Sequence, residues 1–400
     1  MSVLDRILSS HVVGANETEA YGSLIGVGFQ VYDANGLLYS GAAGRQGFDT
    51  ASPLYTTDTV QWIASLTKLI TAVALLQLVD RGLIGLREDL RPRFSEFSSA
   101  QILSGFWPNG TAILVDNTEP LTLRHLLTHT SGYAYDLWNE PLIRWSASIN
   151  RTENSFSWSR EGFRTPLLFA PGESWTYSTG LDWAGYVLEE ITGQSQEEYL
   201  QENIFKPLGM SSTSYNLSTI PNVAERFADW AIASPDDENH LIPESASFLV
   251  PQGEFSMYSG GSGIYSTAAD YAKFLQAVLR GDLLSESTSK LVFQPQLTCS
   301  ERTGLSNASA GDLWEILVPD IYPPGAPLDY GLSGVINLID SPRRRKAGSL
   351  SWSGAANSRW WIDPETGIAA VMTTQVEPNN HPLPRELWRQ LELAVYKELV

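Results

Sequence analysis

A helix that is apolar on nearly every face is predicted to run from Ser65 to about Gly82. Leu69 to Leu78 carries apolar residues at almost every position, and only Thr71 and Gln77 interrupt them. Such a helix has no face that suits water, so other elements must cover it all round. It is also too short to span a bilayer. We therefore expect a globular domain that is built around this helix, in agreement with 43% apolar and 18% charged residues.

The first turn of this helix carries Ser65 and Lys68, three positions apart. At that spacing both side chains project from one helix face. A neutral lysine there can take the serine's proton, and the helix N-terminus favours developing negative charge. The pair predicts a serine nucleophile for acyl transfer. The alternative is coincidence, since Ser287 and Lys290 repeat the spacing in a polar stretch with no buried helix behind it.

Alternating residues predict an antiparallel sheet that is built from both ends of the chain. Val27, Phe29 and Val31 alternate before an Asn35-Gly36 turn, which indicates a hairpin over residues 26–42. Asp363 to Gly367 is the expected turn between the last two strands of this sheet. The C-terminal strands are predicted at Tyr330–Leu338, Leu350–Ile362 and Ala369–Thr374.

Helices are predicted between and around these strands from apolar periodicity and capping residues. The fold class that follows is α/β, with an antiparallel β-sheet flanked by helices and formed by residues 1–85 and 253–400. Residues 86–252 are expected to form an inserted, mostly helical domain. The predicted helices, besides the one at Ser65, are Met1–Gly14, Leu123–Thr128, Leu181–Thr192, Gln196–Asn203, Ala268–Leu279 and Pro384–Leu399.

The net charge of −19 and the pI near 4.6 argue against nucleic acid and anionic membranes as partners. The single cysteine, Cys299, excludes disulfides within the chain and metal sites that need several cysteines. The start of the chain lacks the continuous apolar core of a signal peptide, so we expect a cytoplasmic protein. His125 and His129 lie four apart, but no glutamate follows His125, so packing is preferred over metal binding. No metal or other cofactor is expected.

Two later motifs suit the chemistry of a serine nucleophile. Tyr177, in Tyr-Ser-Thr, follows a Pro-Gly-Glu turn, and a tyrosine beside a serine–lysine pair can shuttle a proton. Trp352-Ser353-Gly354-Ala355 lies on a predicted strand, and a strand-edge N–H beside the N–H of the nucleophile makes an oxyanion hole. Taken alone, Tyr177 among 16 tyrosines is better explained as a loop residue that fills space, and a glycine kink in a core strand is the alternative for the second motif.

Together, Ser-x-x-Lys, Tyr-Ser-Thr and Trp-Ser-Gly-Ala resemble, in their order, the motifs of the serine β-lactamase and penicillin-binding-protein superfamily, class C branch. The resemblance covers roughly residues 20 to 380. Within this superfamily the chain is similar to the fungal lovastatin-type acyltransferases (transesterases), whose relatives include esterases. The stretches that carry this similarity are Leu121–Gly132, Leu181–Gly185, Tyr199–Ile204 and Gly348–Pro364, and Gly260–Thr267 supports the superfamily resemblance.

The resemblance implies that Ser65 is the nucleophile and that Lys68 and Tyr177 share its proton. It also implies that the N–H groups of Ser65 and Ala355 hold the oxyanion. Which of Lys68 and Tyr177 is the formal base stays open, because the two would titrate as a coupled pair.

Two departures from the β-lactamase motifs point to the substrate class. Thr179 stands where those enzymes carry asparagine, and Trp352 stands where they carry lysine. An uncharged aromatic side chain there predicts an uncharged, lipophilic substrate rather than penicillin or peptidoglycan. The residues that are expected to bind substrate are Trp352, Ser353, Gly354, Tyr133, Tyr135 and Trp138.

A basic island, Arg343-Arg344-Arg345-Lys346, interrupts this acidic chain. A solvated hairpin tip is one explanation of the four charges. The alternative is a docking site for an acidic acyl-carrier protein or its phosphopantetheine phosphate.

The sequence therefore predicts a serine acyltransferase that works through a Ser65 acyl-enzyme. It would move a short acyl group from a carrier-protein or small thioester to a hydroxyl of a lipophilic, polyketide-like small molecule. One alternative is a carboxylesterase that hydrolyses a small lipophilic ester through the same intermediate. Another is an inactive relative that serves as a binding or scaffold protein, although such a relative has no chemical reason to keep Ser65, Lys68 and Tyr177 together.

Overall fold

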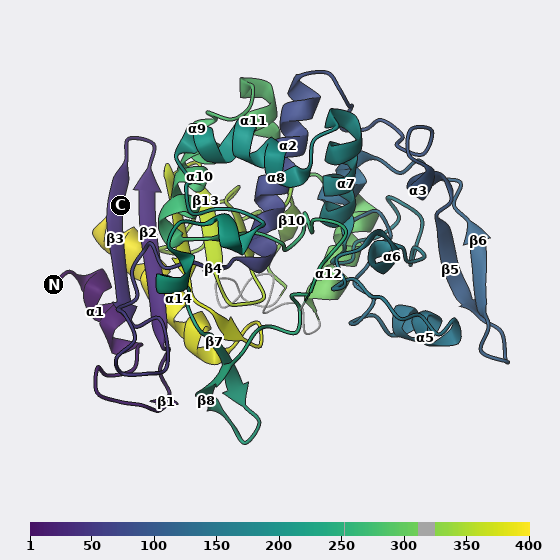
Figure 1. Cartoon of the computed structure of the whole chain (residues 1–400). Helices are drawn as coiled ribbons and strands as arrows, with labels where there is room; N and C mark the ends of the chain where they lie inside the picture. The colour runs from purple at the N-terminus through teal and green to yellow at the C-terminus, as the bar shows by residue number, and fades with distance from the viewer. Residues whose placement is uncertain (252, 311–324) are drawn as a thin grey trace.

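The computed structural model describes residues 1–251, 253–310 and 325–400. Seven strands of the described chain form one antiparallel sheet (Figure 1). Strand β14 joins the C-terminal strands to the N-terminal hairpin, with Met372 opposite Phe29. In spatial order the strands are β10 (Leu328–Tyr330), β11 (Val335–Asn337), β12 (Leu350–Ser353), β13 (Arg359–Asp363), β14 (Ile368–Thr373), β2 (Gly26–Asp33) and β3 (Leu37–Gly44).

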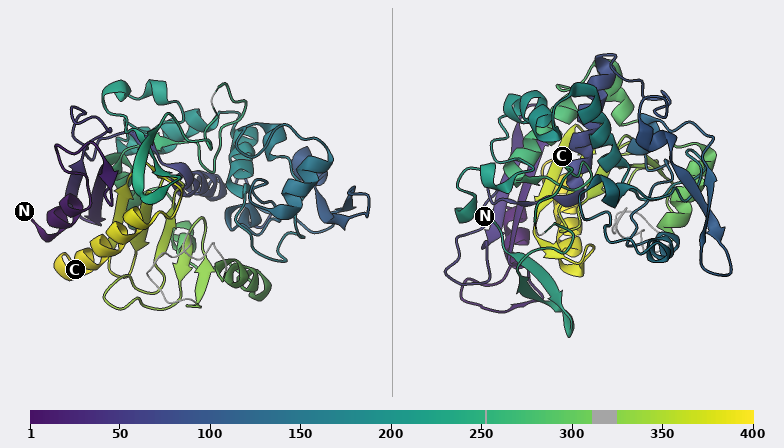
Figure 2. Two further views of the ribbon diagram at one scale, coloured as in Figure 1. Left: turned by 90° about the horizontal axis from the view of Figure 1, so that it is seen from below. Right: turned by 45° about the vertical axis from the view of Figure 1, so that its right-hand side comes forward.

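Helices cover both faces of the sheet, so its central strands are buried on both sides. Alternation along β13 sends Trp361 to one face and Trp360 to the other. On the Trp361 face lie α1 (Val3–Ser10) and α14 (Pro382–Glu398), which contact each other (Figure 2). On the opposite face α10 (Ala268–Arg280) packs against β14 and β2. The predicted α/β class, an antiparallel sheet flanked by helices, is confirmed.

The apolar helix predicted from Ser65 is α2 (Thr67–Asp80), which follows a 3₁₀ turn at Ala64–Leu66. Residues 67–78 are all buried. Helix α2 packs against α7 (Gly180–Thr192) and belongs to the hydrophobic core that also holds residues of the sheet. The prediction of a helix that is covered all round is therefore confirmed. Its burial includes the amine-bearing side chain of Lys68, which needs hydrogen-bond partners inside the protein.

The region from 86 to 252 holds short helices and two hairpins. Its strands β7 and β8 pair with β15 (Val376–Glu377) and β1 (Ala20–Tyr21), which belong to the two ends of the chain. These strands cross the predicted division into residues 1–85 plus 253–400 and residues 86–252, which stays a prediction. The elements are α3 (Ser95–Ser98), β5 (Gln101–Phe106), β6 (Ala112–Asp116), α4 (Leu123–Leu127), α5 (Glu140–Ser148), α6 (Arg160–Phe163), α7, α8 (Gln196–Leu200), α9 (Lys206–Leu208), β7 (Trp230–Ser234) and β8 (Asp237–Glu244).

Two of the predicted strands are hairpins instead. Residues 350–362 form β12 and β13, because the small residues after Ser353 and the left-handed Asn357 (φ +64°) reverse the chain. The N–H of Gly354 donates to the carbonyl of Ser358 at 2.8 Å and closes this turn. Residues 330–338 likewise divide into β10 and β11 around a turn in which Gly331 bonds Gly334.

The other predicted elements are present with small shifts at their ends. The hairpin of β2 and β3 and the turn at 363–367 are confirmed, as are α1, α4, α7, α10 and α14. Helix α8 is shorter than predicted and passes into a π-helical turn at Gln201–Phe205. Among the residues with described structure, no helix has the length and apolarity that crossing a membrane requires.

Candidate active site

The turn before α2 fixes the position of Ser65. Strand β4 (Gln61–Trp62) pairs with β9 (Tyr265–Ser266), and the N–H of Ile63 donates to the carbonyl of Ile264 at 3.1 Å. Ala64 then adopts φ +47°, a left-handed conformation that is strained for alanine and is held here by complete burial. This turn presents the Ser65 side chain at the wall of a cavity.

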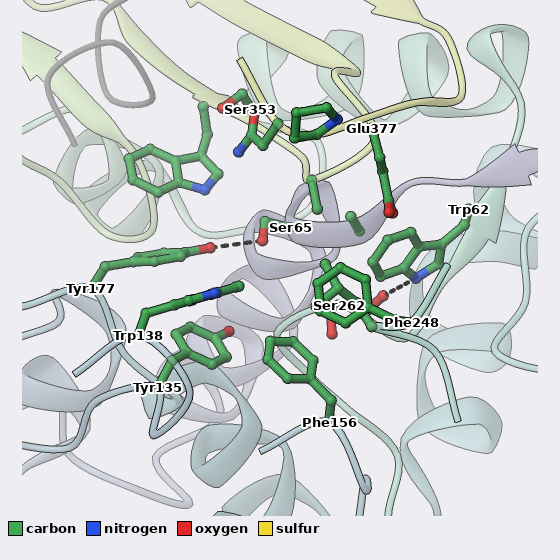
Figure 3. A pocket seen from close by; sticks show the side chains of 16 residues that line it. Trp62, Ser65, Tyr135, Trp138, Phe156, Tyr177, Phe248, Ser262, Ser353 and Glu377 are labelled. Atoms are coloured by element: carbon green, nitrogen blue, oxygen red, sulfur yellow. Dashed lines mark hydrogen bonds between the residues drawn. The ribbon is translucent and has the colours of Figure 1, made fainter. Parts of the chain in front are cut away.

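Ser65 has a partner from its own helix and one from a distant segment, and Figure 3 shows the distant one, Tyr177, with its hydroxyl directed at Ser65. The Tyr177 hydroxyl lies 2.7 Å from Ser65 Oγ, and the Lys68 Nζ lies 3.1 Å from the same oxygen. The structure thus brings together the groups that the sequence singled out for proton transfer. The second serine–lysine pair does not meet in this way: Lys290, in α11 (Glu286–Val292), bonds the exposed Glu286 at 2.6 Å.

The amine of Lys68 has two further partners in the interior. Its Nζ lies 3.0 Å from the Tyr135 hydroxyl and donates to the carbonyl of Gly261 at 2.8 Å. The N–H of Gly261 in turn donates to Asp182 at 3.0 Å, and Ser259 donates to the same carboxyl oxygen at 2.5 Å. Burial raises the pKa of the Asp182 carboxyl, and the nearby Lys68 charge opposes that rise. The Lys68 amine is therefore held by three hydrogen-bond partners, which are Ser65, Tyr135 and the carbonyl of Gly261.

The ring of Tyr177 is fixed by aromatic neighbours. Its centroid lies 5.3 Å from that of Trp352 and 4.9 Å from that of His129. The N–H of Ser178 donates to Nδ1 of His129 at 3.2 Å, so the backbone next to Tyr177 is fixed as well. A tyrosine held on both sides in this way keeps its hydroxyl at Ser65.

His125 and His129, four residues apart, have separate surroundings. His129 lies beyond the end of α4 with φ +61°, and burial lowers its pKa well below the usual value. His125 accepts the N–H of Thr122 at 3.3 Å as part of the cap of α4. Both imidazoles therefore serve the packing and capping of this segment.

The turn between β12 and β13 brings Ala355 to the nucleophile. A Cβ on Gly354 would lie 2.7 Å from the carbonyl oxygen of Ile63, so only glycine permits this approach. Ala355 then lines the cavity with Ser65. The N–H of Ala355 donates to no acceptor within the described parts of the chain. Ala355 thus lies in a turn, whereas the sequence predicted it on a strand.

The cavity beside Ser65 encloses about 350 Å³ and is mostly apolar. Glu377 is the one charged residue among those that line it, all of which are described. The lining residues are Trp62, Ala64, Ser65, Tyr135, Trp138, Phe156, Tyr177, Phe248, Leu249, Ser262, Trp352, Ser353, Ala355, Glu377, Pro378 and Asn379.

Four of the six predicted substrate-binding residues line this cavity: Trp352, Ser353, Tyr135 and Trp138. The other two, Tyr133 and Gly354, do not line it. Tyr133 is buried in the core, where its ring packs 5.7 Å from that of Trp183. Gly354 faces the turn before Ser65 rather than the cavity.

Sequence reasoning missed several wall residues. Two of them could have been found from the sequence. Trp62 stands three positions before Ser65, and Glu377 is a charged residue directly after a run of strand residues. Phe156 and Phe248 come from irregular loops, where neither periodicity nor spacing marks a residue.

The basic island does not form a free patch of four charges. Arg345 is buried and makes two hydrogen bonds to Glu392, at 2.9 and 3.1 Å, and Arg344 is buried beside the same carboxylate. Lys346 bonds Asp340 at 3.0 Å, and Arg343 is exposed. Of the four residues of the predicted dock, Arg344 and Arg345 are thus buried against an acid of α14, and Arg343 and Lys346 remain nearer the surface.

Comparison with known proteins agrees with this geometry. The model of the Beta-lactamase family matches residues 15–395. Monacolin J acid methylbutanoyltransferase of Aspergillus terreus is 34% identical over 86% of this chain and 84% of its own. Lovastatin esterase of Penicillium rubens is 31% identical over 85% and 86% of the two chains. The structure of Simvastatin Synthase (LovD) from Aspergillus terreus superposes with a TM-score of 0.88 at 30% identity, covering 99% of this chain and 98% of that one.

Proposed function

The chain belongs to the Beta-lactamase family and is a serine acyltransferase or esterase, and from that premise we propose the reaction it performs. It moves a short acyl group from a thioester to a hydroxyl of a lipophilic, polyketide-like small molecule. The observation that carries the proposal is the meeting of Ser65, Lys68 and Tyr177 at the wall of an apolar cavity.

In the first half-reaction Ser65 Oγ attacks the thioester carbonyl. Its proton passes to Lys68 and Tyr177, both of which lie within hydrogen-bond distance of Ser65 Oγ. The N–H groups of Ser65 and Ala355 hold the oxyanion of the tetrahedral intermediate. The carbon–sulfur bond then breaks, the leaving thiol takes the proton, and the acyl group stays on Ser65 as an ester.

In the second half-reaction an alcohol attacks the acyl-enzyme. The same pair takes the proton of the alcohol and returns it to Ser65 Oγ when the ester to Ser65 breaks. If water attacks in place of the alcohol, the products are those of a carboxylesterase. Transfer is supported by the aromatic and aliphatic walls of the cavity, which favour a lipophilic acceptor over water.

A relative named as an esterase supports hydrolysis as the second candidate. The inactive-scaffold alternative is disfavoured by the intact hydrogen bonds around Ser65. We further propose that the enzyme acts in the cytoplasm.

The donor is a carrier-bound or a small thioester, and an Arg343→Glu, Lys346→Glu double variant tests for the carrier. It raises KM for a carrier-bound donor only if the carrier docks on these two residues.

The test of the function uses intact mass spectrometry. Incubation with 4-nitrophenyl butyrate or a fluorophosphonate should add one group to the protein, at Ser65, and Ser65→Ala should stay unmodified while folded. Product analysis with a thioester donor and a lipophilic alcohol then compares ester with free acid. More ester supports transfer, and more acid supports the esterase. A folded wild-type protein that takes up no label would favour the scaffold alternative.

A further inference from the structure

Glu377 is an isolated charge in the wall of the apolar cavity. Its side chain is only 7% exposed, and Oε1 has no hydrogen-bond partner among the residues with described structure. Figure 3 shows the carboxyl pointing from its strand toward the ring of Trp62 at the cavity. Since Trp62 Nε1 already donates to the carbonyl of Ser262 at 2.5 Å, that indole does not satisfy the acid.

The position of this carboxyl is fixed by its surroundings. Glu377 lies in β15 and pairs with Ile232 of β7, so its backbone is part of a sheet. Burial raises the pKa of the Glu377 carboxyl, and a hydrogen bond from Ser247 opposes the rise. The carboxyl is therefore anchored on one side and open on the other.

No lysine, arginine or histidine is present among the sixteen lining residues to balance this acid. A buried carboxylate without a counter-charge is costly, and that cost falls when a ligand supplies the missing donor. An acceptor that carried its own carboxylate would place two like charges in one small apolar space, which is strongly unfavourable.

We infer that Glu377 selects the acyl acceptor by charge. It accepts from an electropositive group of the acceptor, either a hydroxyl or an ammonium, and excludes acceptors that carry a free carboxylate. This inference rests on the proposed function, since it concerns the molecule that takes the acyl group from Ser65. One relative is named for an acid, monacolin J acid, so acceptor charge is a property in which members of this family can differ.

The test measures acyl transfer from 4-nitrophenyl butyrate to alcohols of equal chain length that differ only at the far end. The far end is a methyl, a hydroxyl, a trimethylammonium or a carboxylate group. For the wild type we expect kcat/KM for the hydroxyalkanoate to lie at least about tenfold below that for the diol or the trimethylammonium alkanol. Preference for the diol over the cation identifies a hydrogen-bonded hydroxyl, and the reverse identifies a charged partner.

Glu377→Gln keeps the shape and removes the charge, so it should bring the carboxylate and diol rates within about threefold of each other. Two control variants should keep the wild-type order of kcat/KM among the alcohols. Ser247→Ala removes the hydrogen bond to Glu377 but leaves its carboxyl, and Glu244→Gln makes the same Glu-to-Gln change at an exposed position. Stoichiometric release of nitrophenol reports Ser65 acylation separately. Its absence in the wild type would overturn the proposed function. Normal acylation without discrimination against the carboxylate in the wild type, or unchanged discrimination in Glu377→Gln, would overturn this inference alone.

Discussion

Asp182 reaches Lys68 through the backbone of Gly261, whose N–H donates to the carboxylate at 3.0 Å and whose carbonyl accepts from the amine at 2.8 Å. A carbonyl only accepts hydrogen bonds, so one N–H of Lys68 is always directed at Gly261. The remaining positions of the amine face Tyr135 and Ser65. One buried acid thus sets the orientation of the lysine without touching it, which makes Asp182 a positioning residue.

Replacement of Asp182 should therefore slow acylation without removing any reacting group. Asp182→Ala frees the Gly261 loop and should lower the acylation rate by about a hundredfold. Asp182→Asn keeps an oxygen for the Gly261 N–H and should retain more of the rate. Stopped-flow release of nitrophenol measures both, with KM recorded in parallel. Equal rates for the alanine variant and the wild type would show that Gly261 holds its place unaided.

Tyr177→Phe removes the hydroxyl that lies 2.7 Å from Ser65 and keeps the ring against Trp352 and His129. Loss of a group that moves a proton in the transition state should lower the acylation rate by about 10²- to 10⁴-fold. The melting temperature should change little, because the ring packing stays. A nearly normal rate in a stable variant would mean that the proton leaves Ser65 by another path.

Gly354→Ala tests the close approach of the β12–β13 turn to the nucleophile. The added Cβ would meet the Ile63 carbonyl at 2.7 Å, so the turn must move and carry the N–H of Ala355 with it. We expect a loss of about 1–3 kcal/mol in stability and of about 10²-fold in kcat. Gly36→Ala is the matched control, since a Cβ there meets nothing within 4 Å. Full activity in the Gly354 variant would remove Ala355 from the proposed oxyanion hole.

Arg345→Met tests whether the basic island has a structural role. Both Arg345 and Glu392 are buried, and Arg345→Met removes two hydrogen bonds from the carboxylate and leaves it with Arg344 at 3.9 Å. We expect the free energy of unfolding to fall by about 3–5 kcal/mol, and by less in the Arg345→Met, Glu392→Met double variant. Arg343→Glu, at an exposed position, should leave stability within about 0.5 kcal/mol of the wild type. Denaturant titration distinguishes these outcomes.

The buried histidines predict how stability depends on pH. Burial lowers the pKa of His125 to about 4 and that of His129 well below its usual value. The unfolded chain takes up a proton at each imidazole as the pH falls through about 6.5, while the folded chain keeps them neutral. Stability should therefore be complete above that pH and decline below it, toward pH 4.

The matching variant is His129→Asn, since asparagine tolerates the φ of +61° at this position. Its unfolding free energy, measured between pH 6.5 and 5, should depend on pH with a slope about one proton smaller than that of the wild type. Identical slopes would show that His129 gains its proton in the folded state too.

The parts of the fold that were predictable from the sequence are those with a strong local pattern. The apolar run after Ser65 predicts only a buried helix, and Asn35-Gly36 between alternating residues predicts only a hairpin. The structure contains both. The stretch 350–362 was predicted as one strand, although Gly354 and Asn357-Ser358 inside it are turn residues. The pairing of Trp352 with Trp360 in the sheet shows that it forms two strands.

For the candidate site, spacing identified Lys68 and the Tyr-Ser-Thr motif identified Tyr177, but neither signal identified the walls of the cavity. Ser65 and Lys68 share a helix turn, so their contact follows from local geometry. Glu377, Phe156 and Phe248 come together only through tertiary structure, and no local period relates them. The burial of Arg345 was equally hidden, because its partner Glu392 lies 47 positions away on α14.

Strand β2 lies near the start of the chain and pairs with β14 near its end. During synthesis on the ribosome the central sheet therefore cannot close until residues 368–373 have emerged. Until then the apolar helix α2 has α7 beside it but lacks the C-terminal members of its core, such as Trp352 and Trp360. This enzyme should depend on chaperones while it is being made, and truncation after residue 367, which removes β14, should yield insoluble chains rather than a smaller folded unit.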